Sequence, residues 1–115
     1  MPLISIQTST KDLKDSKSFL KELSKEVAEL LRKPERYVMT SLLTNLSMTF
    51  AGDETPSCYV ELKSVGVISA AEAKNLSSVI CKTVSVNLGI DQNRIYIQFE
   101  GVPGGLWGWD GGTFG

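Results

Sequence analysis

Pro2 is the residue whose type and position could do chemistry in this chain. If the initiator Met1 is removed, as is usual before a small residue, Pro2 carries a free secondary amine. An α-amino group has a reference pKa of about 7.7 to 8.0, and burial disfavours its charged form, so a buried terminal amine can be neutral near pH 7 and abstract a proton. Leu3, Ile4 and Ile6 predict that a buried strand holds it. Taken alone, the position has a simpler interpretation, because proline commonly begins an edge strand.

The rest of the composition excludes most other catalytic chemistry. The chain has no histidine, which removes His-based triads, His general bases and the commonest zinc sites. Cys58 and Cys81 form neither a C-x-x-C pair nor a metal-ligand cluster, and we interpret them as buried, inert thiols. Catalysis is left to carboxylates, lysine, tyrosine, hydroxyl groups or the terminal amine. We expect neither a metal nor an organic cofactor.

Length and charge predict one small soluble domain spanning residues 1–115. With 42% hydrophobic residues, the chain can build a core without disulfides or metal. The net charge is -1 and the basic residues are interspersed with acidic ones, so nothing indicates a nucleic-acid partner. No apolar segment is long enough to span a bilayer and no leader begins the chain. We therefore expect a cytoplasmic protein without membrane association, unless a leaderless route exports it.

The first half of the chain has the pattern of a strand, a helix and a second strand. A strand rich in β-branched residues over 3–8 is followed by apolar residues at helical spacing over 19–31. Lys33-Pro34 ends this helix, and 37–43 has the composition of a strand. The candidate N-cap residues of the helix are Ser9, Thr10 and Asp12.

The second half repeats this pattern. Alternating residues over 58–65 predict a half-buried strand, the capping box Ser69-Ala70-Ala71-Glu72 begins a helix that Gly89 ends, and 94–99 is a further strand. Right-handed crossovers would make the strands of each half parallel. The predicted fold is α/β (α+β), with tandem βαβ units forming a four-stranded mixed sheet and two helices on one face. The other face, with the apolar side chains of 37–43 and 95–99, predicts a homo-oligomer.

The last fifteen residues hold seven of the ten glycines and both tryptophans. Such a tail is expected to be too flexible to fold alone. Its large apolar side chains need a neighbouring subunit or a ligand pocket to pack against. The alternative is a flexible tail with incidental aromatic residues. The side chains concerned are Leu106, Trp107, Trp109 and Phe114.

Several short motifs keep a specific order and spacing along the whole chain. They are Pro2, Phe19-Leu20 with Leu23, Lys33-Pro34 with Tyr37, Ser64-Val65-Gly66, Arg94-Ile95-Tyr96-Ile97, Gly108-Trp109 and Thr113-Phe114. Together they resemble the macrophage migration inhibitory factor family of the tautomerase superfamily. The resemblance implies two βαβ units per subunit and a ring-shaped homotrimer. The sheets would line a central channel, and three active sites would lie between subunits.

The same resemblance assigns roles to residues. Pro2 would be the catalytic base, and Lys33 with the backbone N–H of Val65 would hold a substrate carboxylate. Tyr96 and Gln98 would come from the adjacent subunit. Without the resemblance, Lys33 is more simply a solvated lysine at a helix end and Tyr96 a core or interface tyrosine. The walls of the pocket would be Tyr37, Trp109 and Phe114, with Leu3 and Trp107 as further members.

The activity that the resemblance implies is tautomerisation. The expected reaction is keto–enol tautomerisation of phenylpyruvate-like aryl α-keto acids, with a dopachrome-type isomerisation as a second case. The alternative is a cytokine-like interaction protein with a weak or vestigial tautomerase site and a protein receptor that the sequence does not identify. The chain has Gln98 where the animal proteins typically have asparagine. It has Ser57 and Val60 where the animal cytokine has a cysteine pair, so thiol–disulfide activity is not implied.

Overall fold

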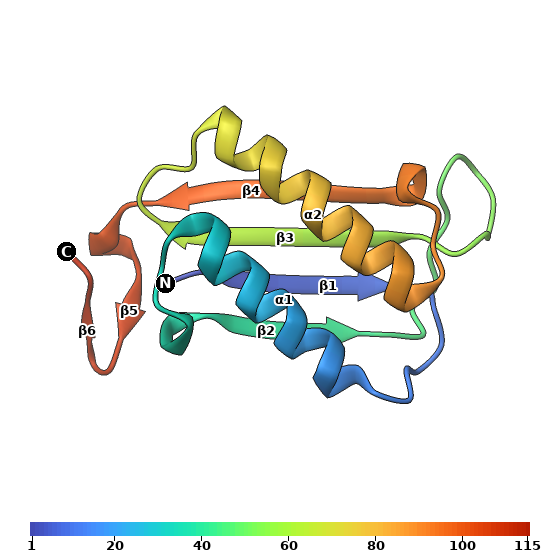
Figure 1. Cartoon of the computed structure of the whole chain (residues 1–115), viewed down its shortest axis with the longest axis horizontal. Helices are drawn as coiled ribbons and strands as arrows, with labels where there is room; N and C mark the ends of the chain where they lie inside the picture. Colours follow the sequence, from blue (N-terminus) through green and yellow to red (C-terminus); the bar gives the residue numbers. More distant parts are fainter.

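A computed structural model describes all 115 residues as one four-stranded sheet with two helices on one face and a short hairpin at the C-terminus (Figure 1). The strand order is β2-β1-β3-β4. β1 pairs parallel with β2, β3 pairs parallel with β4, and β1 and β3 are antiparallel neighbours at the centre. This confirms the predicted tandem βαβ arrangement. The strands are β1 (Leu3–Thr8), β2 (Met39–Leu43), β3 (Cys58–Val65) and β4 (Ile95–Val102).

The first helix, α1 (Ser16–Leu31), begins later than the sequence predicts. Its N-cap is Asp15, whose carboxylate accepts from the Ser18 N–H at 3.1 Å, so the predicted caps Ser9, Thr10 and Asp12 are wrong. Those residues instead belong to the connection from β1, where the Thr10 hydroxyl donates to the Leu88 carbonyl at 3.4 Å. The helix ends at Leu31, because the next residue, Arg32, has a φ of 55° and its N–H turns back to the last carbonyls.

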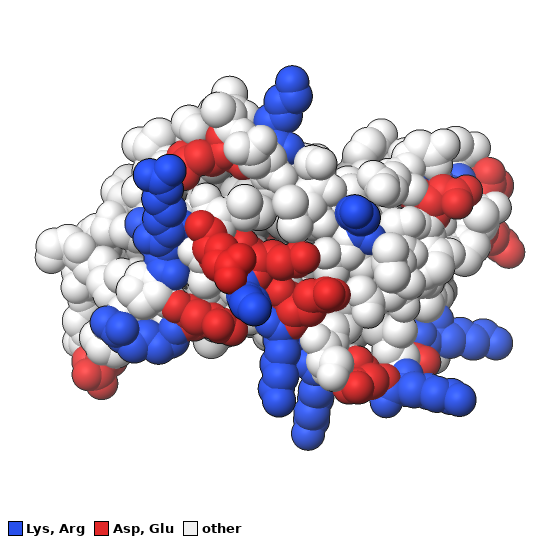
Figure 2. Space-filling model, viewed as in Figure 1, with Lys and Arg blue, Asp and Glu red and all other residues white.

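The second helix, α2 (Ala70–Leu88), has the ends that its sequence predicts. Ser69 and Glu72 form both hydrogen bonds of the capping box, at 3.1 and 3.0 Å. Gly89 ends the helix with a φ of 68°, a conformation that glycine adopts without steric cost. Figure 2 shows the face of the molecule on which both helices cover the sheet. Basic and acidic side chains are interspersed over this face, with a group of acidic residues near its middle.

The core lies between the helices and the sheet, and the two periodicities of the sequence build it. Every second residue of β1 and β3 is buried, and the helices contribute residues three or four positions apart. Burying each such side chain contributes about 1.5–3 kcal/mol. The members with no measurable exposure are Ile4, Leu23, Val27, Val60, Leu62, Leu76, Ile80 and Val84.

The open face of the sheet is more polar than predicted. Ile95, Ile97 and Phe99 belong to the helical core or pack against it, because the alternation along β4 directs them there. The open face instead carries the cross-strand neighbours Ser5, Glu61 and Gln98 at its middle. Large apolar side chains lie only toward its margins, with Met39 66%, Leu43 56% and Tyr96 65% exposed.

The C-terminal tail folds on its own chain, which corrects the expectation that it could not. A short turn (η3, Gly104–Leu106) leads into a hairpin of β5 (Gly108–Trp109) and β6 (Gly112–Thr113). The two connecting residues, Asp110 and Gly111, have φ values of 49° and 79°, as a tight hairpin turn requires. A similar short turn, η1 (Glu35–Tyr37), precedes β2, so Tyr37 lies in a turn and not in the predicted strand.

No helix has the length and apolar content that a membrane crossing requires.

Candidate active site at the N-terminus

A pocket of about 260 Å³ lies at the start of β1, where the N-terminus, the η1 turn and the tail hairpin meet. It is mainly apolar. Larger hollows occur elsewhere, such as one of about 450 Å³ beside Glu54, but polar residues form at least half of their lining and none contains the amino terminus. The pocket at the N-terminus is therefore the candidate site. It is lined by Met1, Pro2, Leu3, Arg36, Tyr37, Val38, Met39, Trp107, Gly108, Trp109 and Phe114.

Pro2 is buried at this pocket, one residue before the first strand. Its carbonyl accepts from the Met39 N–H at 3.0 Å, which extends the β1–β2 pairing by one step. Proline has no N–H to leave unsatisfied there. The backbone that carries the nitrogen is thus fixed by the sheet itself.

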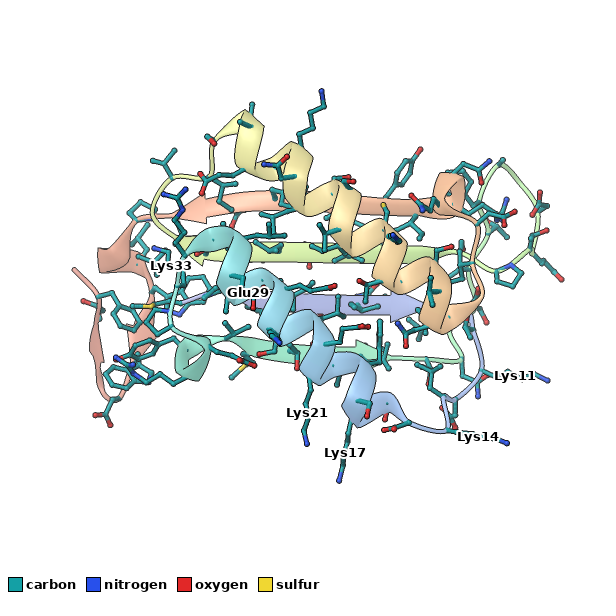
Figure 3. The ribbon with its side chains drawn as sticks, viewed as in Figure 1. Lys11, Lys14, Lys17, Lys21, Glu29 and Lys33 are labelled. Carbon is teal, nitrogen blue, oxygen red and sulfur yellow. The ribbon has the colours of Figure 1, made fainter.

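Lys33 lies just beyond the end of α1, close to the start of β1 (Figure 3). Its ammonium group donates to the Val65 carbonyl at 3.5 Å, so the structure brings these two predicted site residues together. Lys33 contacts the carbonyl of Val65. The role that the sequence predicted for Val65, holding a substrate carboxylate, belongs to its backbone N–H. The other labelled lysines, Lys11, Lys14, Lys17 and Lys21, project outward from the connection before α1 and from its first half (Figure 3).

The electrostatics of this corner disfavour a charged amine. Burial, and then the nearby Lys33 charge, lower the pKa of the Met1 amino group below its usual 8.0. Both causes come from fixed parts of the fold. They act on the Met1 amine, one residue before the nitrogen that becomes the terminal amine once Met1 is removed.

Three aromatic rings form a wall of the pocket that Pro2 lines. Tyr37 meets Trp109 and Phe114 edge-on, with ring centres 5.5 and 6.0 Å apart, and Trp109 stacks on Phe114 at 5.6 Å. The Phe114 N–H donates to the carbonyls of Gly104 and Trp107 at 3.1 and 3.2 Å, which holds the tail over the pocket. A Cβ at Gly104 would approach the Phe114 carbonyl oxygen to 2.6 Å, so this close approach requires glycine.

Tyr96 and Gln98 lie away from the pocket of their own chain. Across the sheet, Tyr96 is level with Gln7 and Gln98 with Ser5. Tyr96 is therefore about 13 Å further along the strand direction than Leu3, at about 3.3 Å per residue. Tyr96 instead packs against the Phe50 ring, with centres 4.9 Å apart, and Gln98 accepts from the Tyr59 hydroxyl at 2.9 Å.

The sequence reasoning missed five lining residues, Met1, Arg36, Val38, Met39 and Gly108. Reading 37–43 as one strand hid the three around Tyr37, because the η1 turn changes the direction of the residues before β2. The signal available was Lys33-Pro34, since proline commonly begins such a turn. Of the predicted wall residues, Leu3, Tyr37, Trp107, Trp109 and Phe114 all line the pocket.

A sheet of two βαβ units with a buried proline behind the initiator places this chain in the tautomerase-fold class of proteins. A family model described as Macrophage migration inhibitory factor (MIF) matches residues 1–115. The chain belongs to the macrophage migration inhibitory factor family.

Individual relatives cover nearly the whole chain. The macrophage migration inhibitory factor of Rattus norvegicus is 31% identical over 114 residues, covering 99% of each chain. A homolog from Brugia malayi is 33% identical and covers all of both chains. The crystal structure of a homologue from Prochlorococcus marinus has a TM-score of 0.96 and 51% identity, covering 98% of this chain and 99% of that one. The family includes proteins with tautomerase activity and proteins with cytokine roles.

Proposed function

We propose that this protein is a tautomerase that interconverts the keto and enol forms of phenylpyruvate-like aryl α-keto acids, with dopachrome-type isomerisation as a second reaction. The observation that carries the proposal is the pocket itself. It joins a buried Pro2, an environment that disfavours a charged amine, and an aromatic wall. Family membership supports the same class of reaction.

In the proposed reaction the neutral Pro2 nitrogen removes a proton from the carbon next to the substrate carbonyl. The electron pair of that C–H bond forms the C=C bond of the enolate, and the carbonyl electrons move to oxygen. Tyr96 of an adjacent subunit, or an ordered water, then protonates that oxygen. Lys33 attracts the substrate carboxylate, while the rings of Tyr37 and Trp109 contact the aryl group.

We also propose a homotrimer with its active sites between subunits. The separation of Tyr96 and Gln98 from the pocket of their own chain supports this, because the roles proposed for them then require a neighbour's pocket. The apolar margins of the open sheet face give the subunits surfaces to bury.

The decisive variant is Pro2→Gly in protein from which Met1 has been removed. Glycine leaves a primary amine with a different geometry at the end of a more flexible chain, so we expect the kcat/KM for phenylpyruvate to fall at least about 100-fold, as loss of a general base does. Pro56→Ala, in the loop before β3, is the matched control. Turnover that survives in folded Pro2→Gly would contradict the proposal.

The second candidate is a cytokine-like interaction protein that binds a protein receptor. Two apolar side chains favour it, since Val67 is 92% and Leu106 78% exposed on the chain. The same preparation discriminates between the two functions. Trivial turnover by folded protein that lacks Met1 supports the interaction role, whereas robust turnover supports the enzyme.

A further inference from the structure

Arg36 is a cation at the pocket that the proposed reaction does not use. Its guanidinium lies over the Tyr37 ring, 4.8 Å from the ring centre, and the residue lines the same pocket as Pro2. The residue is exposed, and its side chain makes no hydrogen bond. The chain has a single salt bridge, between Arg94 and Asp53, so no carboxylate neutralises Arg36.

The acidic residues closest in sequence to this corner do not change that conclusion. Glu35 adjoins Arg36 and Asp110 lies in the hairpin turn after Trp109, but neither forms an ion pair with it. Stacking on Tyr37 holds the guanidinium in place, so less conformational freedom is lost when it binds an anion. A fixed, unpaired guanidinium at the edge of an apolar pocket suits a ligand carboxylate.

Arg36 lines the pocket, whereas Lys33 lies outside the lining, just beyond the end of α1. Lys33 contacts the end of β3 through the Val65 carbonyl and influences the amino terminus. Arg36 covers Tyr37, whose other contacts are Trp109 and Phe114 of the tail. For a substrate whose α-keto carboxylate is drawn toward Lys33 and whose ring lies on the aromatic wall, Arg36 is the cation at that wall that is left for a ring substituent.

We propose that Arg36 is a second anion-binding group of this pocket, and that the preferred substrates are aryl α-keto acids whose ring bears a second negative charge, such as a carboxylate. The inference that the preferred substrates are keto acids rests on the proposed function. The inference that Arg36 binds an anion does not, because it concerns binding alone.

Binding is measured first, with ligands that cannot tautomerise. Terephthalate and 4-carbamoylbenzoate share a benzoate group and differ in one negative charge, and both tryptophans of the chain line the pocket, so tryptophan fluorescence reports occupancy. We expect terephthalate to bind about 3- to 10-fold more tightly, the range for a charge-assisted hydrogen bond at a partly exposed site. Arg36→Gln should reduce this ratio to about one, and Arg36→Lys should leave an intermediate ratio because lysine lacks the planar fork.

Arg32→Gln is the matched control, since it removes the same charge at a residue that lies four positions before Arg36 and does not line the pocket. It should keep the wild-type ratio. An equal ratio in wild type and Arg36→Gln, an equal loss in Arg32→Gln, or failure of both ligands to bind would overturn the inference.

A kinetic comparison separates this inference from the proposed function. The readout is the ratio of kcat/KM for 4-carboxyphenylpyruvate to that for phenylpyruvate, which Arg36→Gln should lower by a similar factor. If both substrates are turned over with the same ratio in both proteins, the tautomerase proposal stands and the Arg36 inference fails. If neither is turned over but the binding ratio depends on Arg36, the anion site stands and the catalytic proposal fails.

Discussion

The chemistry of Pro2 depends on what surrounds the amino terminus. Met1 is partly exposed, yet burial and Lys33 already lower the pKa of its amino group. Pro2 is buried and one residue closer to the sheet. Once Met1 is removed, we expect the same two causes to lower the pKa of the Pro2 amine as well.

Retention of Met1 should abolish catalysis without unfolding the protein. A preceding residue converts the Pro2 nitrogen into a tertiary amide, whose lone pair is delocalised into the carbonyl and is not basic. Activity per mole should therefore scale with the fraction of processed chain, which intact mass gives for each preparation. Full activity in a sample whose chains all retain Met1 would exclude Pro2 as the base.

The pH profile of the processed enzyme follows from the direction of the same shift. The base works only when it is neutral, and a lowered pKa makes it neutral at lower pH. The kcat/KM should rise with pH through this depressed pKa and level off below about 7.7, the lower reference value for an α-amino group. A midpoint above that value would show that the pocket does not depress the pKa of the amine.

Lys33→Ala should raise KM for a carboxylate substrate by more than it lowers kcat. The proposed role of the ammonium group is to attract the carboxylate in the ground state and the transition state alike. A loss of about 1.5–3 kcal/mol, as for a charged hydrogen bond, corresponds to a rise of about 10- to 150-fold. Lys21→Ala, on the outer side of α1, is the control (Figure 3). An unchanged KM would remove Lys33 from the site.

At the residue scale, the sequence predicts the wall of the pocket better than its edge. Leu3, Trp107 and Phe114 are large apolar residues that had to be buried somewhere, and the tail and the first strand meet at the pocket. Arg36 and Met39 were missed because their orientation depends on a three-residue turn, which hydrophobic periodicity does not encode.

At the scale of elements, the start of β4 is tied to the loop before β3 by one side chain. The Arg94 guanidinium donates to the carbonyls of Phe50, Thr55 and Pro56 at 2.7–3.3 Å and pairs with Asp53 at 2.9 Å. It also lies 5.2 Å from the centre of the Phe50 ring, which packs on Tyr96. Arg94 thereby positions the ring that the proposed mechanism presents to a neighbouring subunit.

Arg94→Ala should lower the free energy of unfolding by about 2–3 kcal/mol, because several carbonyls lose a charged donor at once. Urea unfolding followed by circular dichroism measures the change. Lys74→Ala on the exposed side of α2 is the control and should change stability by less than about 0.5 kcal/mol. A similarly small effect of Arg94→Ala would mean that the loop is held by its own turns.

The elements with strong local signals are those that the sequence predicts well. β3 alternates without interruption over 58–65, and α2 has both a capping box and a terminal glycine, so their bounds follow from local chemistry. The N-cap of α1 was placed too early because several Ser, Thr and Asp residues precede the helix and only the tertiary structure selects Asp15. The tail hairpin was missed, although Asp110-Gly111 is the dipeptide such a turn favours.

At the scale of the whole molecule, the open sheet face has a polar middle and apolar margins. The Tyr59 hydroxyl donates to Gln98 at 2.9 Å and lies 3.2 Å from the Glu61 carboxylate, and the Ser41 hydroxyl donates to Ser5 at 3.2 Å. A face of this kind is unsuited to a dry interface across its full width. It suits the proposed ring, in which subunits would meet at the margins and the polar middle would face a central channel.

The proposed trimer makes a prediction that no monomer can meet, because each active site needs two chains. Sedimentation should give a homotrimer, and a stable monomer at micromolar concentration would exclude it. Pro2→Gly subunits lack the base and should be nearly inactive alone, and Tyr96→Ala subunits lack the residue given to the neighbour and should keep only the slower turnover that protonation by water allows. Refolded together in equal amounts, they should form mixed trimers in which about a quarter of the sites have both residues intact, as random assembly of a cyclic oligomer gives. Mixed trimers, verified by mass, that are no more active than the two variants assayed separately would show that Pro2 and Tyr96 act from the same chain or that Tyr96 takes no part.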